Sequence, residues 1–149
     1  METTVTPRSG LGGAGIVLTL VAAVVVVIGS IGTWVVSDVA GLSIGGLDKD
    51  GPILIGLALV AVVQTIVAAT SGLKRPWWLV LSVVVAALCV LTGFIDLADV
   101  DSNDLGGAIE AGWGLKVAAY GSLGLLAGTV MTVIATLGAR APASESQSP

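Results

Sequence analysis

Four long stretches of this chain contain no charged residue, and they limit its possible folds more than any other feature. These stretches lie between Arg8 and Asp38, Asp50 and Lys74, Arg75 and Asp96, and Lys116 and Arg140. Each has about 20 residues or more, which is the length of a helix that crosses the hydrocarbon of a bilayer. A charge at the centre of such a helix costs about 2.5–3.5 kcal/mol. The charge pattern therefore predicts four transmembrane segments.

The composition agrees with a lipid environment. The chain is 55% hydrophobic and only 11% charged, whereas soluble domains average about 25% charged residues. The apolar runs are continuous and do not alternate with polar residues, which favours helices over barrel strands. We predict an all-α membrane protein, a four-helix transmembrane bundle with up-down topology. Its domain covers residues 13–138, with helices near 13–36, 52–72, 76–95 and 113–138.

The remaining segments are short. We expect a cytoplasmic N-terminal tail over 1–12 and a disordered cytoplasmic tail over 139–149, which is rich in Ser, Pro and Ala. Outer loops cover 37–51 and 96–112. The first is rich in glycine and is typical of turns or a small hairpin. The inner link 73–75 is so short that the second and third helices must be antiparallel neighbours.

Basic residues indicate the orientation. Arg8, Lys74, Arg75 and Arg140 all fall on one side of the predicted bundle. Lys and Arg collect in cytoplasmic loops, so we expect both termini in the cytoplasm of a multi-pass plasma membrane protein. Tryptophans at the predicted helix ends would sit at the interfaces with water; these are Trp34, Trp77, Trp78 and Trp113.

Three segments carry a resemblance to a known group of proteins. They are "GTWVV", "GLDKDGPILIGLALV" and "GWGLKVAAYGSLGLLAG". Together they resemble small actinobacterial membrane proteins with four helices, an aromatic residue ending the first helix and an Asp-Gly pair before the second. The resemblance implies a bacterial plasma membrane and no particular activity.

The second outer loop is the most acidic part of the chain. Asp99, Asp101, Asn103 and Glu110 fall at positions 1, 3, 5 and 12 of a calcium-loop pattern. Asp104 stands where that pattern requires glycine. One interpretation is therefore a weak Ca²⁺ site, and the other is an ordinary solvated turn, since Asp, Asn, Ser and Gly are common in turns.

Small and polar residues inside the spans allow two interpretations each. Gln64 and Thr65 could line a solute path or hydrogen-bond to a neighbouring helix. Gly124, Gly128 and Thr132 recur every fourth residue, a spacing that lets helices approach closely. This close approach could serve packing within the bundle or dimerisation.

Several functions are excluded by what the sequence lacks. There is no histidine and only one cysteine, so a Ser-His-Asp or Cys-His catalytic site is impossible, and we predict no cofactor and no enzyme activity. The net charge of −4 argues against nucleic acid binding.

We expect a non-enzymatic accessory or scaffold component of a membrane complex, with an acidic outer face. Its partners would be the lipid bilayer and a membrane protein or a second copy of the chain. The alternatives are a small channel or transporter subunit and an extracytoplasmic divalent-cation-binding protein.

Overall fold

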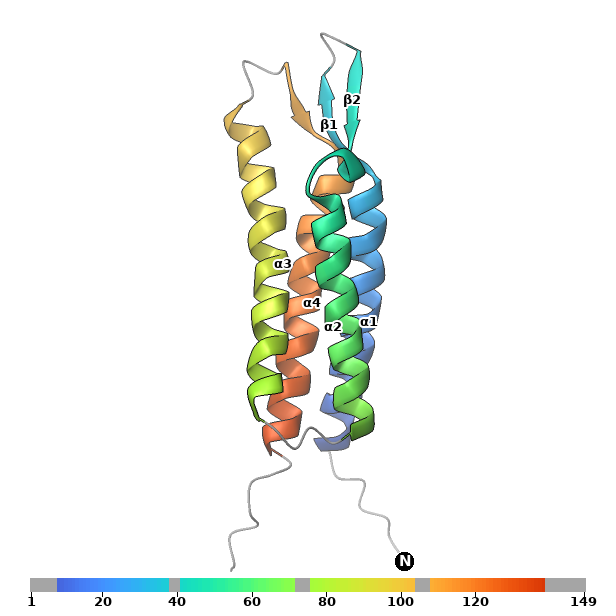
Figure 1. The fold of residues 1–149 in the computed structure, drawn as a ribbon, viewed down its shortest axis with the longest axis vertical. Coiled ribbons are helices and arrows are strands. Elements are labelled where there is room, and N and C mark those ends of the chain that lie inside the picture. The colour runs from blue at the N-terminus through green and yellow to red at the C-terminus, as the bar shows by residue number, and fades with distance from the viewer. Residues whose placement is uncertain (1–7, 38–40, 72–75, 104–107, 139–149) are drawn as a thin grey trace, which may run out of the picture.

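The residues that the structure describes include four long helices. They form a bundle in which consecutive helices run in opposite directions (Figure 1). The computed structural model describes residues 8–37, 41–71, 76–103 and 108–138. The helices are α1 (Arg8–Ile31), α2 (Gly51–Ser71), α3 (Pro76–Ser102) and α4 (Trp113–Gly138).

The two ends of the bundle differ. α1 begins and α4 ends at one end, which we call the termini end (Figure 1). The opposite end carries strands β1 (Thr33–Ser37), β2 (Leu42–Gly45) and β3 (Glu110–Ala111) and a short 3₁₀ helix, η1 (Gly46–Asp48). We call it the sheet end.

Three of the described helices are long and apolar enough to cross a membrane. They contain the spans Gly10–Ile31, Val80–Ser102 and Trp113–Gly138. The corresponding apolar stretch of α2, Gly51–Val67, is shorter. The fold therefore agrees with the prediction of a helical membrane protein.

The outward faces of all four helices are apolar. Val17, Leu59, Val80 and Ile134, one on each helix, are each more than half exposed. Soluble proteins rarely expose apolar patches larger than a few hundred Å², so this surface suits lipid better than water. The same environment explains why the valine run 24–27 is helical. Valine is a poor helix former, but in lipid a helix satisfies every backbone polar group within one segment.

The prediction that the first helix extends to residue 36 is wrong. The helix ends at Ile31, and the segment "TWVVS" forms β1. At the boundary the Gly32 amide bonds back to the carbonyls of Ile28 and Gly29, and its own carbonyl accepts the Gly46 amide at 2.9 Å. β-Branched and aromatic residues suit a strand, and a continuous apolar run does not distinguish a strand from a helix.

The predicted end of the third helix is also wrong, since α3 continues past residue 95 to Ser102. The prediction placed the helix end at the first charged residue, Asp96, but a helix can extend beyond the apolar region into water. Its last turn is closed by side chains: Asn103 Nδ2 and Ser102 Oγ both donate to the Asp99 carbonyl, at 2.8 and 2.9 Å. Such bonds satisfy a carbonyl that the helix end leaves unpaired.

Within the described residues, a three-stranded sheet joins the connection between α1 and α2 to the connection between α3 and α4, in the order β2-β1-β3. β1 pairs antiparallel with both neighbours; Val36 lies opposite Ser43 on one side and Glu110 on the other. The Gly112 amide also donates to the Trp34 carbonyl at 2.7 Å. The end of the acidic connection is therefore tied to the end of α1.

α1 and α4 pack so closely that glycine is required along their contact. A Cβ atom at Gly128 would lie 2.6 Å from the Thr19 amide nitrogen, and one at Gly15 would lie 2.8 Å from the Thr132 amide nitrogen. Nearer the sheet end, a Cβ at Gly114 would meet Gly32 and Gly29. The predicted small-residue series on the fourth helix therefore packs within the bundle, against α1.

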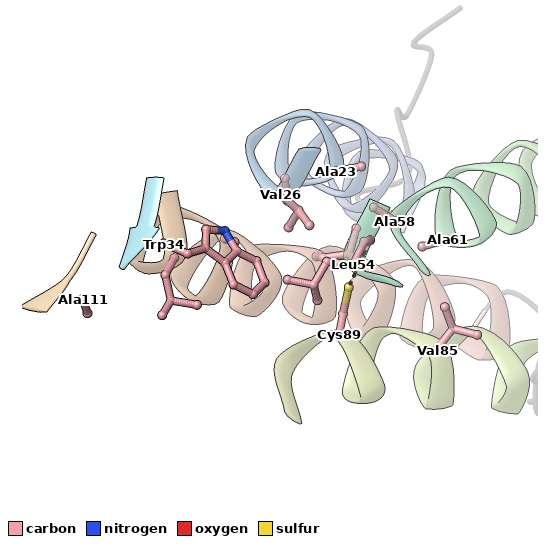
Figure 2. Packing of buried hydrophobic residues seen from close by; sticks show 13 residues of the cluster. Ala23, Val26, Trp34, Leu54, Ala58, Ala61, Val85, Cys89 and Ala111 are labelled. Atoms are coloured by element: carbon pink, nitrogen blue, oxygen red, sulfur yellow. Dashed lines mark hydrogen bonds between the residues drawn. The ribbon is translucent and has the colours of Figure 1, made fainter. Parts of the chain in front are cut away.

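Alanine is the commonest residue of the bundle core, and larger side chains pack among the alanines (Figure 2). Leu54, Leu115 and Leu125 are fully buried, as are Val26 and Cys89. The Cys89 thiol points at the Leu54 carbonyl, with sulfur and oxygen 4.0 Å apart. Cys89 thus acts as a small packing residue between α3 and α2.

Candidate functional site

A polar cavity lies at the sheet end. Its volume is about 140 Å³. Elements far apart in sequence contribute to its wall: β1, the start of α2, the end of α3 and the start of α4. The lining residues are Trp34, Val35, Lys49, Asp50, Asp96, Asp99, Val100 and Leu115.

Trp34 forms the apolar part of this wall and fixes the sheet against the bundle. Its side chain is only 2% exposed, and its Nε1 donates to the Gly29 carbonyl at 3.1 Å. A Cβ atom at Gly46 would collide with the indole nitrogen, so glycine is needed there. The Trp34 ring is therefore held inside the protein and does not lie on the surface, where an interfacial indole would contact lipid and water.

The other tryptophans differ from Trp34. Trp113 is 54% exposed and Trp78 is 38% exposed, which is compatible with positions at the surface of the bundle. The side chain of Trp77 lies outside the described residues.

Asp96 is the least satisfied group of the cavity. Its Oδ2 is buried and has no hydrogen-bond partner. The charges that act on it come from Asp50 at the α2 start, from Asp99 one turn further along α3 and from Lys49. Three carboxyls thus face one ammonium group, and the excess of acid favours occupancy of the cavity by a cationic species over an anionic one.

The predicted calcium ligands lie on two different elements. Asp99 and Asp101 are in α3, Asn103 follows its last turn, and Glu110 is in β3. Asn103 Nδ2 also donates to the Asp99 carboxylate, at 3.1 Å. Among the residues the structure describes, no three acidic, cysteine or histidine side chains are grouped to hold a metal ion.

The Ca²⁺ site remains a prediction, because residues 104–107 of the loop lie outside the described residues. If the site exists, the wild type should release or take up heat on binding Ca²⁺, with a dissociation constant on the order of 10⁻⁴–10⁻³ M. This heat should be lost in Asp99→Ala/Glu110→Ala. Calorimetric titration of the purified full chain checks this. Equal heats for the wild type and the double variant would show that these residues bind no Ca²⁺.

The buried hydroxyls and amide of the helices do not line the cavity at the sheet end. Several buried hydroxyls donate to carbonyls one turn earlier in their own helices, at 2.6–2.9 Å: Thr19, Ser30, Thr65, Ser122 and Thr129. Gln64 is only 9% exposed, and its Oε1 accepts no hydrogen bond within the described residues. The hydroxyls are therefore satisfied within their own helices, whereas Gln64 Oε1 is a buried acceptor left without a hydrogen bond.

Comparisons with family models, with curated proteins and with solved structures give no match to this chain.

The convergence of Asp50 and Asp96 is a feature that the sequence analysis missed. A signal was present, because the link between α2 and α3 is short and the two helices are antiparallel. Residues equally far from that link must then lie side by side, as Leu54 and Cys89 do. Counting outward from the link would have placed the start of α2 next to the end of the apolar part of α3.

Proposed function

We propose that this chain is a non-enzymatic accessory or scaffold component of a membrane complex in a bacterial plasma membrane. All four helices would cross the bilayer, with both termini in the cytoplasm and the sheet end outside. The distribution of Lys and Arg supports this orientation. The resemblance to small actinobacterial membrane proteins supports the choice of membrane.

The observation that carries this proposal is the direction of the polar side chains inside the bundle. Their hydroxyls donate to carbonyls of their own helices, which supports a packing role over a solute path. Gln64 and Thr65 are buried within one bundle, so a pore formed between copies could not be lined by them. A scaffold needs only a stable bundle and exposed surfaces, whereas a channel needs a continuous polar path.

The sheet end offers a surface that a partner could cover. Leu42, Ile44 and Leu47 are all exposed there, on β2 and the adjoining η1. Exposed apolar side chains beside charged ones are typical of protein interaction sites. β2 is also an edge strand in the described sheet, and such an edge can pair with an extended segment of another chain.

Crosslinking in intact cells, followed by purification through a tag on the C-terminus, tests the accessory role. We expect one partner in reproducible stoichiometry, recovered at least fivefold less with Leu42→Ser/Ile44→Ser. The matched control is Ser102→Ala at the same end of the bundle, which should recover the partner normally. Recovery that is the same for all three proteins, or no partner at all, would contradict the proposal.

Ion flux separates this function from the channel alternative. Proteoliposomes that contain the purified chain should release K⁺ and Na⁺ no faster than empty vesicles. Ion flux above the level of empty vesicles, if it decreases in Gln64→Leu, would favour a channel and overturn the scaffold assignment.

A further inference from the structure

An apolar groove between α1 and α2 opens on the outside of the bundle. Its volume is about 290 Å³, and eight apolar side chains line it: Leu20, Ala23, Val24, Val27, Ile28, Ala58, Leu59 and Val62. The lining contains no polar side chain, unlike the cavity at the sheet end.

Two alanines create the space. Ala23 on α1 and Ala58 on α2 are almost fully buried, while Val24, Ile28 and Leu59 are about half exposed. The alanines therefore form the floor of the groove and the larger side chains form its rim; Figure 2 labels Ala23 and Ala58 on the two helices. A leucine at either floor position would fill much of the volume.

The dimensions suit one hydrocarbon chain. Leu20 and Ile28 are eight residues apart, which corresponds to about 12 Å along a helix. A cavity of about 150 Å³ holds benzene, so a groove of about 290 Å³ has room for about ten carbon atoms. Such a chain would pack closely against both helices, and this packing is the main source of attraction between apolar groups in a bilayer.

A protein partner is a poorer fit for this groove. Stable protein interfaces involve about 20–30 residues on each side, and eight side chains over about three helical turns offer much less. The rest of α1 is already occupied, since α4 packs against its glycine face from Gly15 to Gly32. The space that remains on this side of the bundle matches an acyl chain better than a helix.

We propose that the groove between α1 and α2 binds one hydrocarbon chain of a membrane lipid. The site rests on the placement of the bundle in a membrane and is independent of the accessory role. Its failure would leave that role untouched, because the partner surface lies at the sheet end.

A photoreactive lipid tests the site. The full chain is reconstituted in vesicles of dioleoyl-phosphatidylethanolamine and dioleoyl-phosphatidylglycerol, with a small fraction of phosphatidylcholine that carries a diazirine in one acyl chain. After irradiation, mass spectrometry of the digested protein locates the adducts. We expect at least fivefold more adducts on the groove residues than on Val84 and Leu88. These two are similarly exposed, and they lie on α3 at a comparable depth because Cys89 is opposite Leu54.

A variant in which larger side chains fill the groove gives a second test of the site. In Ala23→Leu/Ala58→Leu, adducts on α1 and α2 should fall to the level of the α3 face, while Val84→Leu should leave the wild-type pattern unchanged. Equal labelling of the two faces in the wild type would overturn the proposal without any variant. Adducts on α1 and α2 that persist in Ala23→Leu/Ala58→Leu would also overturn it. So would a crosslink between two copies of Val24→Cys, because it would show that a second chain covers the groove.

Discussion

At the scale of single residues, the closeness of α1 and α4 gives the sharpest prediction. Gly128→Ala adds a Cβ that would lie 2.6 Å from the Thr19 backbone, so the helices must separate. Overpacking of this kind costs about 1–3 kcal/mol. Thermal or denaturant unfolding of the purified chain in detergent micelles measures the loss.

Gly56→Ala is the matched control, because a Cβ at Gly56 meets no atom within 4 Å. It should keep or raise stability by up to about 1 kcal/mol, since alanine is the better helix former. If both variants lose the same stability, the close contact between α1 and α4 is not what makes Gly128 necessary.

The polar cavity makes a second prediction at this scale. Asp96 faces the like charges of Asp50 and Asp99, with Lys49 as the opposing cation. Asp96→Asn removes one of the acidic groups at nearly constant shape and should raise stability at neutral pH by an amount on the order of 1 kcal/mol. The gain should shrink at high salt, which screens charge repulsion.

Asp101→Asn is the comparison for this variant, because Asp101 is exposed on the same helix and does not line the cavity. It should change stability by less than about 0.5 kcal/mol. Destabilisation by Asp96→Asn would mean that the Asp96 carboxylate is held by favourable bonds and not opposed by its neighbours.

At the scale of elements, the sheet is where sequence reasoning was least complete. Charge-free stretches and the length of a bilayer predicted all four helices, and the second and fourth nearly to their observed ends. The same reasoning assigned Thr33–Ser37 to a helix. The central residues of this segment are apolar because Trp34 and its neighbours pack on the bundle end. Burial in protein and burial in lipid both favour apolar residues, so the sequence does not distinguish them.

The candidate site depends on contacts that no local pattern encodes. β3 has only two residues and forms because β1 is there to pair with it. Asp50 and Asp96 meet because α2 and α3 are antiparallel, which the short link did predict. What could not be predicted is the glycine at 46, whose role depends on the position of the Trp34 ring.

A disulfide tests the pairing of β1 with β3. Val36 and Glu110 are cross-strand partners, and Cα atoms of such pairs lie about 4.5–5.5 Å apart, within the range that a disulfide spans. In a Cys89→Ala background, Val36→Cys/Glu110→Cys should form an intramolecular disulfide under mild oxidation, seen by mass spectrometry. Val36→Cys/Asp101→Cys joins no paired positions and should stay reduced; the opposite result would contradict the sheet.

At the scale of the whole molecule, the fold separates two kinds of surface. The sides are apolar on every helix, with exposed residues such as Val17, Leu59, Val80 and Ile134. Apart from Arg8 at the start of α1, the charged residues that the structure describes gather at the sheet end, at the α2 start, the α3 end, β3 and the α4 start. This arrangement fits a bundle in a membrane, and it is the reason why we propose the sheet end as the surface for partners.

Cysteine labelling in intact cells tests four crossings and the proposed orientation most directly. In a Cys89→Ala background, Ser102→Cys places a thiol at the exposed end of α3, and Ser144→Cys places one in the C-terminal segment. A membrane-impermeant maleimide should label position 102 in intact cells and position 144 only after permeabilisation. Equal labelling of both positions in intact cells would contradict the account, because it would put the sheet end and the C-terminus on the same side of the membrane.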